Sequence, residues 1–496
     1  MNERGKSDSP VVPAKPSNNA ASAVAEVVEG RGLAKGNAAS KTRPGRSAGA
    51  DAPSALDRVR QAARRDKKAK FTALLHHVDV DRLQAAYRAI NPRAAVGVDE
   101  VTWQGYGQDL EANLQDLHTR VQRGSYRAKP SRRAYIPKAD GRLRPLGIAA
   151  LEDKIVQRAV VEVLNGVYEE DFLGFSYGFR PGRGPHDALD ALAVGITRKK
   201  VNWVLDADIR DFFGQLDRGW LTKFVEHRIA DGRLLRLIQK WLNAGVIEDG
   251  EWTDQGQGTP QGASVSPLLG NVYLHHVFDL WAHDWRQRHA DGDVVIARFA
   301  DDVVVGFEHE RDARRFWTDL RERFAKFNLE LAEDKTRLVE FGRYAARNRA
   351  RRGLGRPETF AFLGFTHICG VSRNGRFLLK RVTIAKRMRA KLKQLNVELK
   401  RRAHLPIPDQ GRWLASVVRG HLAYYAVPGN IQAVAAFRDR VVRLWYKALR
   451  RRSQRGRLNW KRMQRLETRW LPPARIQHPW PNVRFDARTQ GRSPVR

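Results

Sequence analysis

The sequence predicts an α+β protein, with helices and strands mixed in the middle of the chain and helices alone on either side. Apolar residues recur at three-to-four spacing between residues 56 and 125, which is typical of helices. Between residues 126 and 379, strand-like runs such as RRAYIPK and VNWVLDADI alternate with amphipathic helical segments. Between residues 380 and 470 the strand pattern fades, and three basic helical segments follow one another.

The first 55 residues are rich in Ala, Gly, Ser, Pro and basic residues and have no hydrophobic periodicity. Such a segment cannot bury enough apolar surface to offset the entropy lost on ordering, so we expect a disordered basic tail. An organelle transit peptide is only a minor alternative. Such peptides are poor in acids, and this segment carries Asp8, Glu26 and Glu29. The N-terminus also lacks the apolar core of a secretory signal.

The helical extension over residues 56–125 contains two amphipathic stretches, FTALLHHVDVDRLQAAYRAI and LEANLQDLHTRV. Pro92 and Gly97 predict a loop between them. In the middle region, EDKIVQRAVVEVLNGVY and RLLRLIQKWLNAGV show the same helical period. Prolines and a glycine separate the three C-terminal helices, and residues 471–496 are expected to form a C-terminal tail.

The charge of the chain is far from balanced. Lys and Arg number 90 against 54 acids, which gives a net charge of +36. A folded protein with this excess repels itself, and a polyanionic partner is the usual reason to tolerate it. Nucleic acid is favoured over a merely solubilising surface, because the excess is spread along the whole chain. A membrane partner is disfavoured, since there is no apolar run of transmembrane length and no lipidation motif.

The chain has one cysteine, Cys369. A single thiol can form neither an internal disulfide nor a Cys-rich zinc site, so a zinc-stabilised nuclease module is not expected. One thiol also suits a reducing cytosol, and we expect a cytoplasmic protein.

Two apolar runs end in acids. In RFADDVVV (298–305), two short buried strands are expected to meet at a tight turn that carries Asp301 and Asp302. A plain hairpin with a solvent-facing Asp-Asp turn is the alternative. A second run, VLDADIRDFF (204–213), weighs against it, because Asp206 and Asp208 share one face of an extended strand. Two strand ends that present Asp can hold two Mg²⁺ ions about 3.5–4 Å apart for phosphoryl transfer.

The FADD hairpin resembles the Tyr-x-Asp-Asp signature of reverse transcriptases. Over roughly residues 60–490 the chain is similar to group II intron-encoded reverse transcriptases and maturases of the bacterial type that lacks the C-terminal nuclease domain. The matching blocks, in family order, are IPKADGRLRPLGI, LEDKIVQRAVVEVL, SYGFRPGRGPHDAL, VLDADIRDFF, GTPQGASVSPLLGNVYL, RFADDVVV, LELAEDKTRLVEFG and FAFLGF. Downstream, GRWLASVVRGHLAYYAVPGN and VVRLWYKALRRRSQ resemble the maturase, or thumb, region.

The resemblance implies a right-hand polymerase fold. Its N-terminal helical extension would span 56–125, its fingers and palm 126–379, and its all-α thumb or maturase region 380–470. Asp208 and Asp301 would be the principal ligands of two Mg²⁺ ions, and Asp302 would complete the catalytic triad. Asp206 has the right face, but the family pattern points to Asp208.

The resemblance also implies the residues that contact the nucleotide. Phe213 would be the aromatic wall that excludes a ribose 2′-hydroxyl, although it could equally be a core residue. Lys138 and Arg144 would hold the triphosphate, with a generic basic surface as the alternative. Gln261 would lie on a glycine-flanked loop beside nucleotide and template. Lys335 would support the site.

The chain departs from the family pattern in three places. Phe299 stands where the family has Tyr, and Ala263 where a second Gly is common. The strand motif usually reads Gly, Phe, Phe, Asp, where this chain has Asp211, Phe212, Phe213 and Gly214. These positions lie outside the triad, so activity is still expected, with effects on rate, packing or metal affinity.

The implied function is RNA-directed DNA synthesis together with assistance to intron splicing and retrohoming, at the bacterial nucleoid. The implied partners are the structured intron RNA, an RNA template with a DNA primer, deoxynucleoside triphosphates and target DNA. The basic helices fit RNA because their charge is nearly all of one sign and aromatic residues are interleaved, although basic side chains also simply solubilise helices. Two alternatives are a splicing factor without polymerase activity and a reverse transcriptase with a host function in defence or repair.

Overall fold

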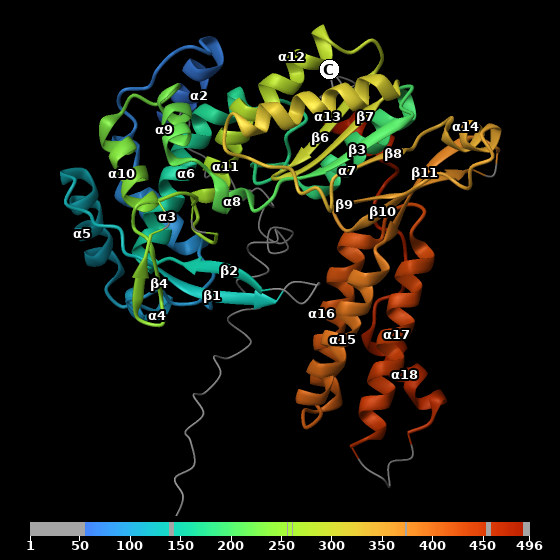
Figure 1. The fold of residues 1–496 in the computed structure, drawn as a ribbon. Coiled ribbons are helices and arrows are strands. Elements are labelled where there is room, and N and C mark those ends of the chain that lie inside the picture. The colour runs from blue at the N-terminus through green and yellow to red at the C-terminus, as the bar shows by residue number, and fades with distance from the viewer. Residues whose placement is uncertain are drawn as a thin grey trace, which may run out of the picture. The chain divides into compact units, whose positions relative to one another are not determined.

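The structure is a computed structural model, and it describes residues 55–137, 143–254, 256–259, 261–372, 374–452 and 458–489 (Figure 1). The basic tail predicted for the N-terminus therefore lies almost entirely outside the described residues. The chain divides into two compact units. The first comprises the described parts of residues 1–167 and 225–266, and the second those of 168–224 and 267–496.

Helices make up most of the first unit. Asp231, at the start of its last helix, accepts backbone hydrogen bonds from Arg233 and Leu234 of that helix and from Leu74 and Leu75 of a distant segment. One buried carboxylate therefore caps a helix and fastens another stretch of chain to it. The helices are α2 (Ala55–Arg65), η2 (Leu75–His77), α3 (Val80–Ala89), α4 (Trp103–Tyr106), α5 (Leu110–Arg123), most of α6 (Leu151–Asp171), the end of α9 (Arg218–Glu226), and α10 (Gly232–Leu242).

The first unit also contains a four-stranded sheet with the order β2-β1-β4-β5. Its strands are β1 (Ser131–Pro137), β2 (Leu143–Ile148), β4 (Val246–Glu248) and β5 (Glu251–Thr253). β1 and β2 are antiparallel, with Ile136 opposite Arg144, and β4 joins β1 in parallel. The strand predicted at RRAYIPK is confirmed as β1.

The second unit is built on a four-stranded antiparallel sheet with the order β6-β7-β3-β8. The strands are β3 (Trp203–Asp208), β6 (Val294–Phe299), β7 (Asp302–Phe307) and β8 (Arg337–Glu340). Helix α7 (Pro185–Arg198) packs closely on β6, because Gly195 leaves room for Val295. Helix α13 (Glu310–Ala325) packs against β3 and β7.

A three-stranded antiparallel sheet with the order β11-β10-β9 shares a hydrophobic core with this part of the unit. Its strands are β9 (Phe360–Phe362), β10 (Phe365–Val371) and β11 (Phe377–Thr383). β11 continues beyond residue 379, the predicted end of the mixed region, because Thr383 still pairs with Phe365. The other helices of this part are α8 (Phe212–Gln215), most of α9, α11 (Ser266–Leu274), the π-helical segment η3 (His275–Asp279), α12 (Leu280–Arg288) and α14 (Ala345–Arg351).

The three helices predicted after residue 380 are present as α15 (Ala385–Arg401), α16 (Ile407–Tyr425) and α17 (Ile431–Arg450). Their apolar faces form one core, in which Trp445 is fully buried and donates a hydrogen bond from Nε1 to Gln410 at 3.0 Å. The sequence did not predict α18 (Trp460–Trp470) or α19 (Pro481–Thr489). α19 packs on α7 and places Phe485 in the core beneath the sheets.

Among the described residues, no helix is both long and apolar enough to cross a membrane.

Candidate active site

Three carboxylates lie at one end of the β6-β7-β3-β8 sheet. Asp208 is the last residue of β3, Asp302 is the first residue of β7, and Asp301 lies in the turn just before it. The register places Asp208 opposite Asp302. Opposite residues of antiparallel strands have Cα atoms about 4.5–5.5 Å apart. The structure thus brings together two acidic stretches that are far apart in the sequence.

The hairpin of β6 and β7 turns on only two residues, Ala300 and Asp301. Ala300 has a left-handed backbone with φ of 56°, which costs a residue with a Cβ about 1–2 kcal/mol. Asp302 is already paired with Phe299 as the first rung of the hairpin. The two neighbouring carboxylates therefore differ in setting, because one is on the turn and the other on the strand.

The backbone of this turn lies directly against Gly178, in the segment SYGFRPG. A Cβ on Gly178 would be 2.2 Å from the amide nitrogen of Ala300. Two backbone hydrogen bonds of 2.9 Å, from Tyr177 to the Arg298 carbonyl and from Arg298 to the Phe175 carbonyl, hold the segment against β6. Glycine is required at position 178 because the two backbones approach so closely.

Arg298 supports the same turn from beneath and is fully buried. Its Nε and Nη2 atoms donate to the two carboxylate oxygens of Asp279 at 2.7 and 2.6 Å. The guanidinium also donates to Ser176 Oγ at 2.7 Å, to Asn271 Oδ1 at 3.0 Å and to the Ala300 carbonyl at 3.0 Å. The Arg298 guanidinium therefore joins η3 through a bidentate ion pair, and the turn, α11 and the SYGFRPG segment through single hydrogen bonds.

The three carboxylates affect one another electrostatically. Asp302 is exposed at the start of β7, next to Asp301 and opposite Asp208. Partial desolvation by the surrounding sheet end, together with the negative charges of Asp301 and Asp208, raises the pKa of Asp302 to about 7. A cluster that resists carrying all its negative charge is stabilised by an added cation.

Lys335 and Asp206 flank Asp208. Lys335 Nζ donates to Asp208 Oδ2 at 2.5 Å, so this lysine contacts a site carboxylate directly. Asp206 lies opposite Arg337 of β8 and accepts a backbone hydrogen bond from Ala361. Desolvation raises the pKa of Asp206 to about 6. Asp206 is therefore engaged with β8 and the segment beyond it, while Asp208 lies opposite the hairpin acid.

Phe213 lies on the short helix α8, just after β3, and is half-buried. Its ring meets that of Phe212 edge-on, with the ring centroids 5.0 Å apart. Both rings contact the space above Gly270 of α11, where a Cβ would lie 3.0 Å from Phe212 and 3.1 Å from Phe213. Because Gly270 has no side chain, the Phe213 ring can pack closely against the backbone of α11.

The unusual pair Asp211 and Gly214 is spatially coupled. A Cβ on Gly214 would lie 2.2 Å from Asp211 Oδ2. Asp211 itself adopts a left-handed φ of 37°, a conformation that glycine takes more easily. The acid at 211 thus occupies the space that a side chain at 214 would fill, which explains how the chain accommodates both departures from the family pattern.

The other nucleotide-contacting residues predicted from the sequence belong to the first unit. Arg144 lies on β2 and is half-buried. The Gln261 carbonyl accepts a hydrogen bond of 2.7 Å from the backbone amide of Gly147, which lies on β2 with Arg144. The glycine-flanked loop therefore packs against β2. Lys138 lies outside the described residues.

The small number of carboxylates at the sheet end suits magnesium. Within the described residues, no group of three or more His, Cys, Asp or Glu side chains is arranged closely enough to hold an ion unaided. Mg²⁺ commonly takes only one or two carboxylates and completes its shell with water and substrate phosphates. Two opposed strand carboxylates with a third on the adjoining turn fit a site that a nucleotide completes.

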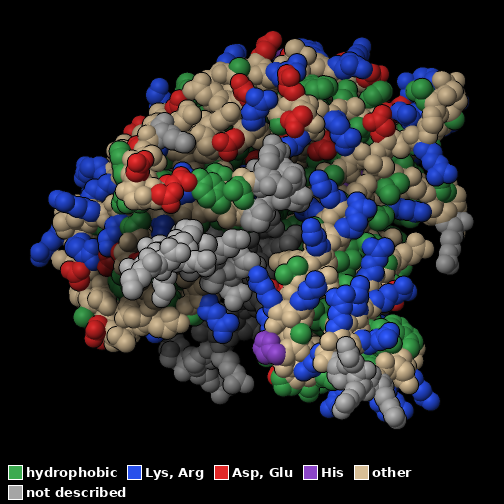
Figure 2. All heavy atoms as spheres, turned by 60° about the horizontal axis from the view of Figure 1, so that its bottom comes forward, with side chains coloured by type: hydrophobic (Ala, Val, Ile, Leu, Met, Phe, Trp, Pro, Cys, Tyr) green, Lys and Arg blue, Asp and Glu red, His purple; other side chains and the backbone are tan. Residues whose placement is uncertain are grey.

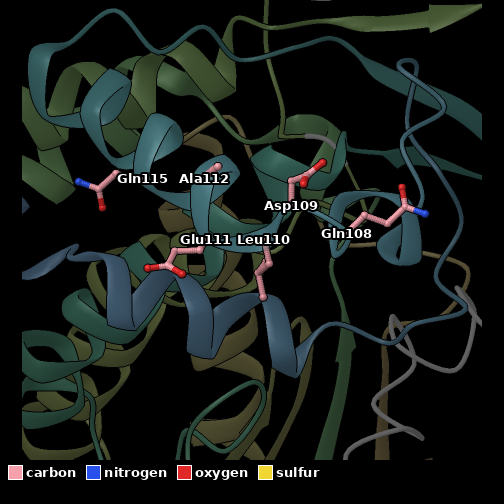
Figure 3. Close-up of a pocket in the computed structure, with 6 residues that line it drawn as sticks. All are labelled: Gln108, Asp109, Leu110, Glu111, Ala112 and Gln115. Carbon is pink, nitrogen blue, oxygen red and sulfur yellow. The ribbon is translucent and has the colours of Figure 1, made fainter.

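A surface depression of about 570 Å³ lies elsewhere, at the start of α5 (Figure 3). Its labelled side chains point away from one another, and none is cationic. The depression has no cationic side chain to bind a triphosphate, so the end of the β6-β7-β3-β8 sheet remains the candidate active site. The lining residues are Gln108, Asp109, Leu110, Glu111, Ala112 and Gln115.

Sequence reasoning missed the support of the hairpin, namely Arg298, Asp279, Asn271 and Gly178. A signal was available in VVIARFADD, because an arginine within a buried apolar run must find a carboxylate or carbonyl partner. The identity of those partners was not available, since they come from separate segments.

Comparison with known proteins agrees with this geometry. Residues 136–367 match the family described as reverse transcriptase (RNA-dependent DNA polymerase). Protein YkfC of Escherichia coli (strain K12) is 39% identical over 191 residues, which is 38% of this chain and 50% of that protein. Group II intron-encoded protein LtrA of Lactococcus lactis subsp. cremoris is 32% identical over 227 residues, 45% of this chain and 37% of that protein. Nuclear intron maturase 3, mitochondrial, of Arabidopsis thaliana is 31% identical over 125 residues, 25% and 17% of the two chains.

The chain thus spans half or less of the length of these relatives. The family match runs from β1 into β10 and includes Asp208, Asp301 and Asp302. The resemblance inferred from the sequence motifs is confirmed: residues 136–367 match the reverse transcriptase family, and the chain is similar to a group II intron-encoded protein and to an intron maturase.

Proposed function

We propose that the chain is an RNA-directed DNA polymerase and intron maturase, which binds a structured intron RNA and copies it into DNA. The observation that carries the proposal is the register that sets Asp208 opposite Asp302, with Asp301 on the adjoining turn. Two Mg²⁺ ions bound there would stabilise the attacking primer oxygen and the leaving pyrophosphate. Asp208 and Asp301 are assigned as the main ligands, with Asp302 as the third.

The protein's own groups prepare this reaction. Lys335 supplies a positive charge beside Asp208 and is placed to assist the nucleotide's phosphates. Lys138 and Arg144 are assigned to the triphosphate, and Gln261 to the nucleotide and template. Phe213, which packs against Gly270, is assigned to contact the sugar of the nucleotide. If so, Phe213→Ala should raise ribonucleotide incorporation relative to deoxynucleotide by at least ~10-fold, measured in single-nucleotide extension.

The polymerase assignment divides the molecule into familiar parts. The first unit contains the N-terminal extension and fingers, the β6-β7-β3-β8 sheet and its helices are the palm, and α15–α17 form the thumb. The support lies in the family match over 136–367 and in the three-helix core that follows it.

The maturase assignment is supported by the charge on the C-terminal helices. A groove of about 380 Å³ between α15 and α17 has four cations around an apolar floor. Lys393, Arg440 and Lys447 are exposed and have no ion-pair partner among the described residues. Figure 2 shows Lys and Arg side chains gathered over the C-terminal helices, with few acids on the face in view. Such a surface fits RNA phosphates.

Primer extension on poly(rA) with oligo(dT) and Mg²⁺ tests the proposal. We expect dTTP incorporation by the full chain, its loss on chelation, and its return when Mg²⁺ is restored. Asp301→Ala should lower the rate by at least ~10³-fold, because several kcal/mol of transition-state stabilisation depend on the metals. Asp291→Ala, which removes an exposed acid paired with Arg311, is the matched control and should change nothing. Equal incorporation by the Asp301→Ala variant and the wild type would overturn the proposal and favour a splicing factor without synthesis.

A further inference from the structure

The segment between β8 and β9 has a concentration of arginine that neither the catalytic site nor the C-terminal helices explain. Residues 343–356 contain six arginines, no lysine and no acid. An exposed helical segment normally mixes both signs of charge, because ion pairs three or four residues apart stabilise it. Six like charges in one short segment repel one another unless acids elsewhere in the fold or a bound anion offset them.

Half of these arginines hold the segment in place. Arg352 donates to the buried carboxylate of Glu340, and Arg349 lies 3.7 Å from the same carboxylate. Arg349 also lies 3.6 Å from Glu358, and Arg343 donates to the Thr197 carbonyl at 2.6 Å. The end of β8 thus anchors the segment firmly.

The segment also begins at a fixed point. Gly342 is forced to be glycine, because a Cβ there would lie 1.8 Å from the Val201 carbonyl oxygen. The adjacent amide of Phe341 donates to the Asn202 carbonyl at 2.8 Å. The backbone that carries the arginines is therefore held against the start of β3.

The other half of the arginines face solvent. Arg347, Arg351 and Arg356 are exposed and have no carboxylate partner in the part of the chain that the structure describes. The Arg347 guanidinium lies over the Tyr344 ring, 5.1 Å from its centroid, which holds that side chain in one direction. A fixed backbone with three unpaired guanidinium groups is prepared to bind phosphates, for which arginine offers a planar fork that lysine lacks.

This cluster lies at the opposite end of the sheet from the candidate active site. Glu340 pairs with Trp203, the first residue of β3, whereas Asp208 is the last. Asp208 lies five residues further along the strand than Trp203, which corresponds to roughly 17 Å. The phosphates bound here are therefore not those that react at Asp208.

We propose that Arg347, Arg351 and Arg356 form a binding site for the phosphate backbone of a folded RNA, separate from the polymerase site. The inference rests on the proposed function, in which the chain binds structured RNA as well as a template and primer. It adds a second RNA contact, on the sheet edge, to the one assigned to α15–α17.

Equilibrium binding of labelled transfer RNA to the full-length protein tests this site. The variant Arg347→Ala/Arg351→Ala/Arg356→Ala should bind the RNA at least ~10-fold more weakly at low salt. Its slope of log affinity against log salt should be shallower by about 2–3, since three phosphate contacts are lost. The KM for poly(rA)/oligo(dT) and the rate of dTTP incorporation should stay within about twofold of wild type.

Two further variants separate the site from a general charge effect. The matched control Arg311→Ala/Arg314→Ala/Arg321→Ala removes three exposed arginines from the same unit, each paired with an acid, and should leave RNA binding unchanged. The variant Arg347→Lys/Arg351→Lys/Arg356→Lys should keep most of the salt slope but lose part of the affinity.

Three outcomes would overturn the inference. They are unchanged transfer-RNA binding by the triple alanine variant, an equal loss in the matched control, and a parallel rise in the KM for the primer–template. The last would mean that the arginines hold the substrate duplex. Absence of dTTP incorporation by the wild type would reject the proposed polymerase activity, while the binding comparison would still decide this site.

Discussion

The two parts of the second unit use arginine in opposite ways. Beneath the sheets, Arg298 and Arg381 are buried and form ion pairs with Asp279 and Asp190 at 2.6 and 2.7 Å. In the α15–α17 bundle, cations such as Arg440 are exposed and have no ion-pair partner among the described residues. Burial and pairing, rather than residue type, therefore separate the arginines that shape the site from those available to bind RNA.

The energetic consequences also differ. Desolvating an ion costs several kcal/mol, and only good geometry with further hydrogen bonds offsets it, so losing one partner of a buried pair leaves the other charge uncompensated. In the bundle, folding depends on the apolar core around Trp445, and exposed cations without an ion-pair partner, such as Arg440, contribute mutual repulsion. Replacing a buried, paired arginine should therefore destabilise the sheet region, whereas replacing an exposed cation of the bundle should leave its stability nearly unchanged.

The largest effect is expected for Arg298→Ala. It leaves Asp279 buried without its partner and removes the hydrogen bond to the Ala300 carbonyl. We expect a loss of about 3–5 kcal/mol in the free energy of unfolding, measured by urea denaturation, together with loss of primer extension. Arg440→Ala in the bundle is the control and should change stability by less than ~0.5 kcal/mol. Similar losses for both variants would contradict the distinction.

The next effect compares one substitution in two places. Gly178→Ala sets a Cβ against the backbone of the catalytic hairpin, which cannot move aside as a side chain can. We expect a cost near the upper end of the ~1–3 kcal/mol typical of overpacking. Gly420→Ala lies on an exposed turn of α16 with nothing within 4 Å, so it should stabilise the protein by roughly 0.5–1 kcal/mol. Thermal denaturation of both variants checks the opposite signs.

These two predictions also show what the sequence could convey. The acids at 206, 208, 301 and 302 and the three basic helices were predictable, because strand alternation, helical period and apolar runs are local patterns. The partners of Arg298 come from α11, η3 and the SYGFRPG segment, and only the fold brings them together. Helix α19 is short, and its place on α7 depends on Phe485 reaching a distant core, which no local pattern indicates.

A pH effect of intermediate size should arise from His367 of β10. The side chain is fully buried and stacks on Phe360, with the two ring centroids 4.6 Å apart. Burial, with a smaller contribution from Arg381, lowers the pKa of His367 to about 3. The unfolded state, with a pKa near 6.5, therefore binds the proton first as pH falls, and folding stability is lost below about pH 6.5.

Between about pH 7.5 and pH 5 this loss should reach about 2 kcal/mol, because each pH unit below 6.5 contributes about 1.4 kcal/mol. His367→Leu should remove that part of the pH dependence, whatever it does to stability at neutral pH. Urea denaturation at both pH values measures the difference. An unchanged pH dependence in the variant would show that His367 is not protonated on unfolding in this range.

The smallest effect on stability is expected in the bundle, where RNA affinity should change although stability does not. Lys393→Ala/Arg440→Ala/Lys447→Ala removes three exposed cations around the α15–α17 groove. Stability should change by no more than ~0.5 kcal/mol, since no partner is left unpaired and repulsion falls. RNA affinity should nevertheless drop, with a salt slope shallower by about 2–3, because these charges are free to meet phosphates. A stable variant with unaltered RNA binding would mean that the cations only keep the helices soluble, and a destabilised one that they contribute to folding after all.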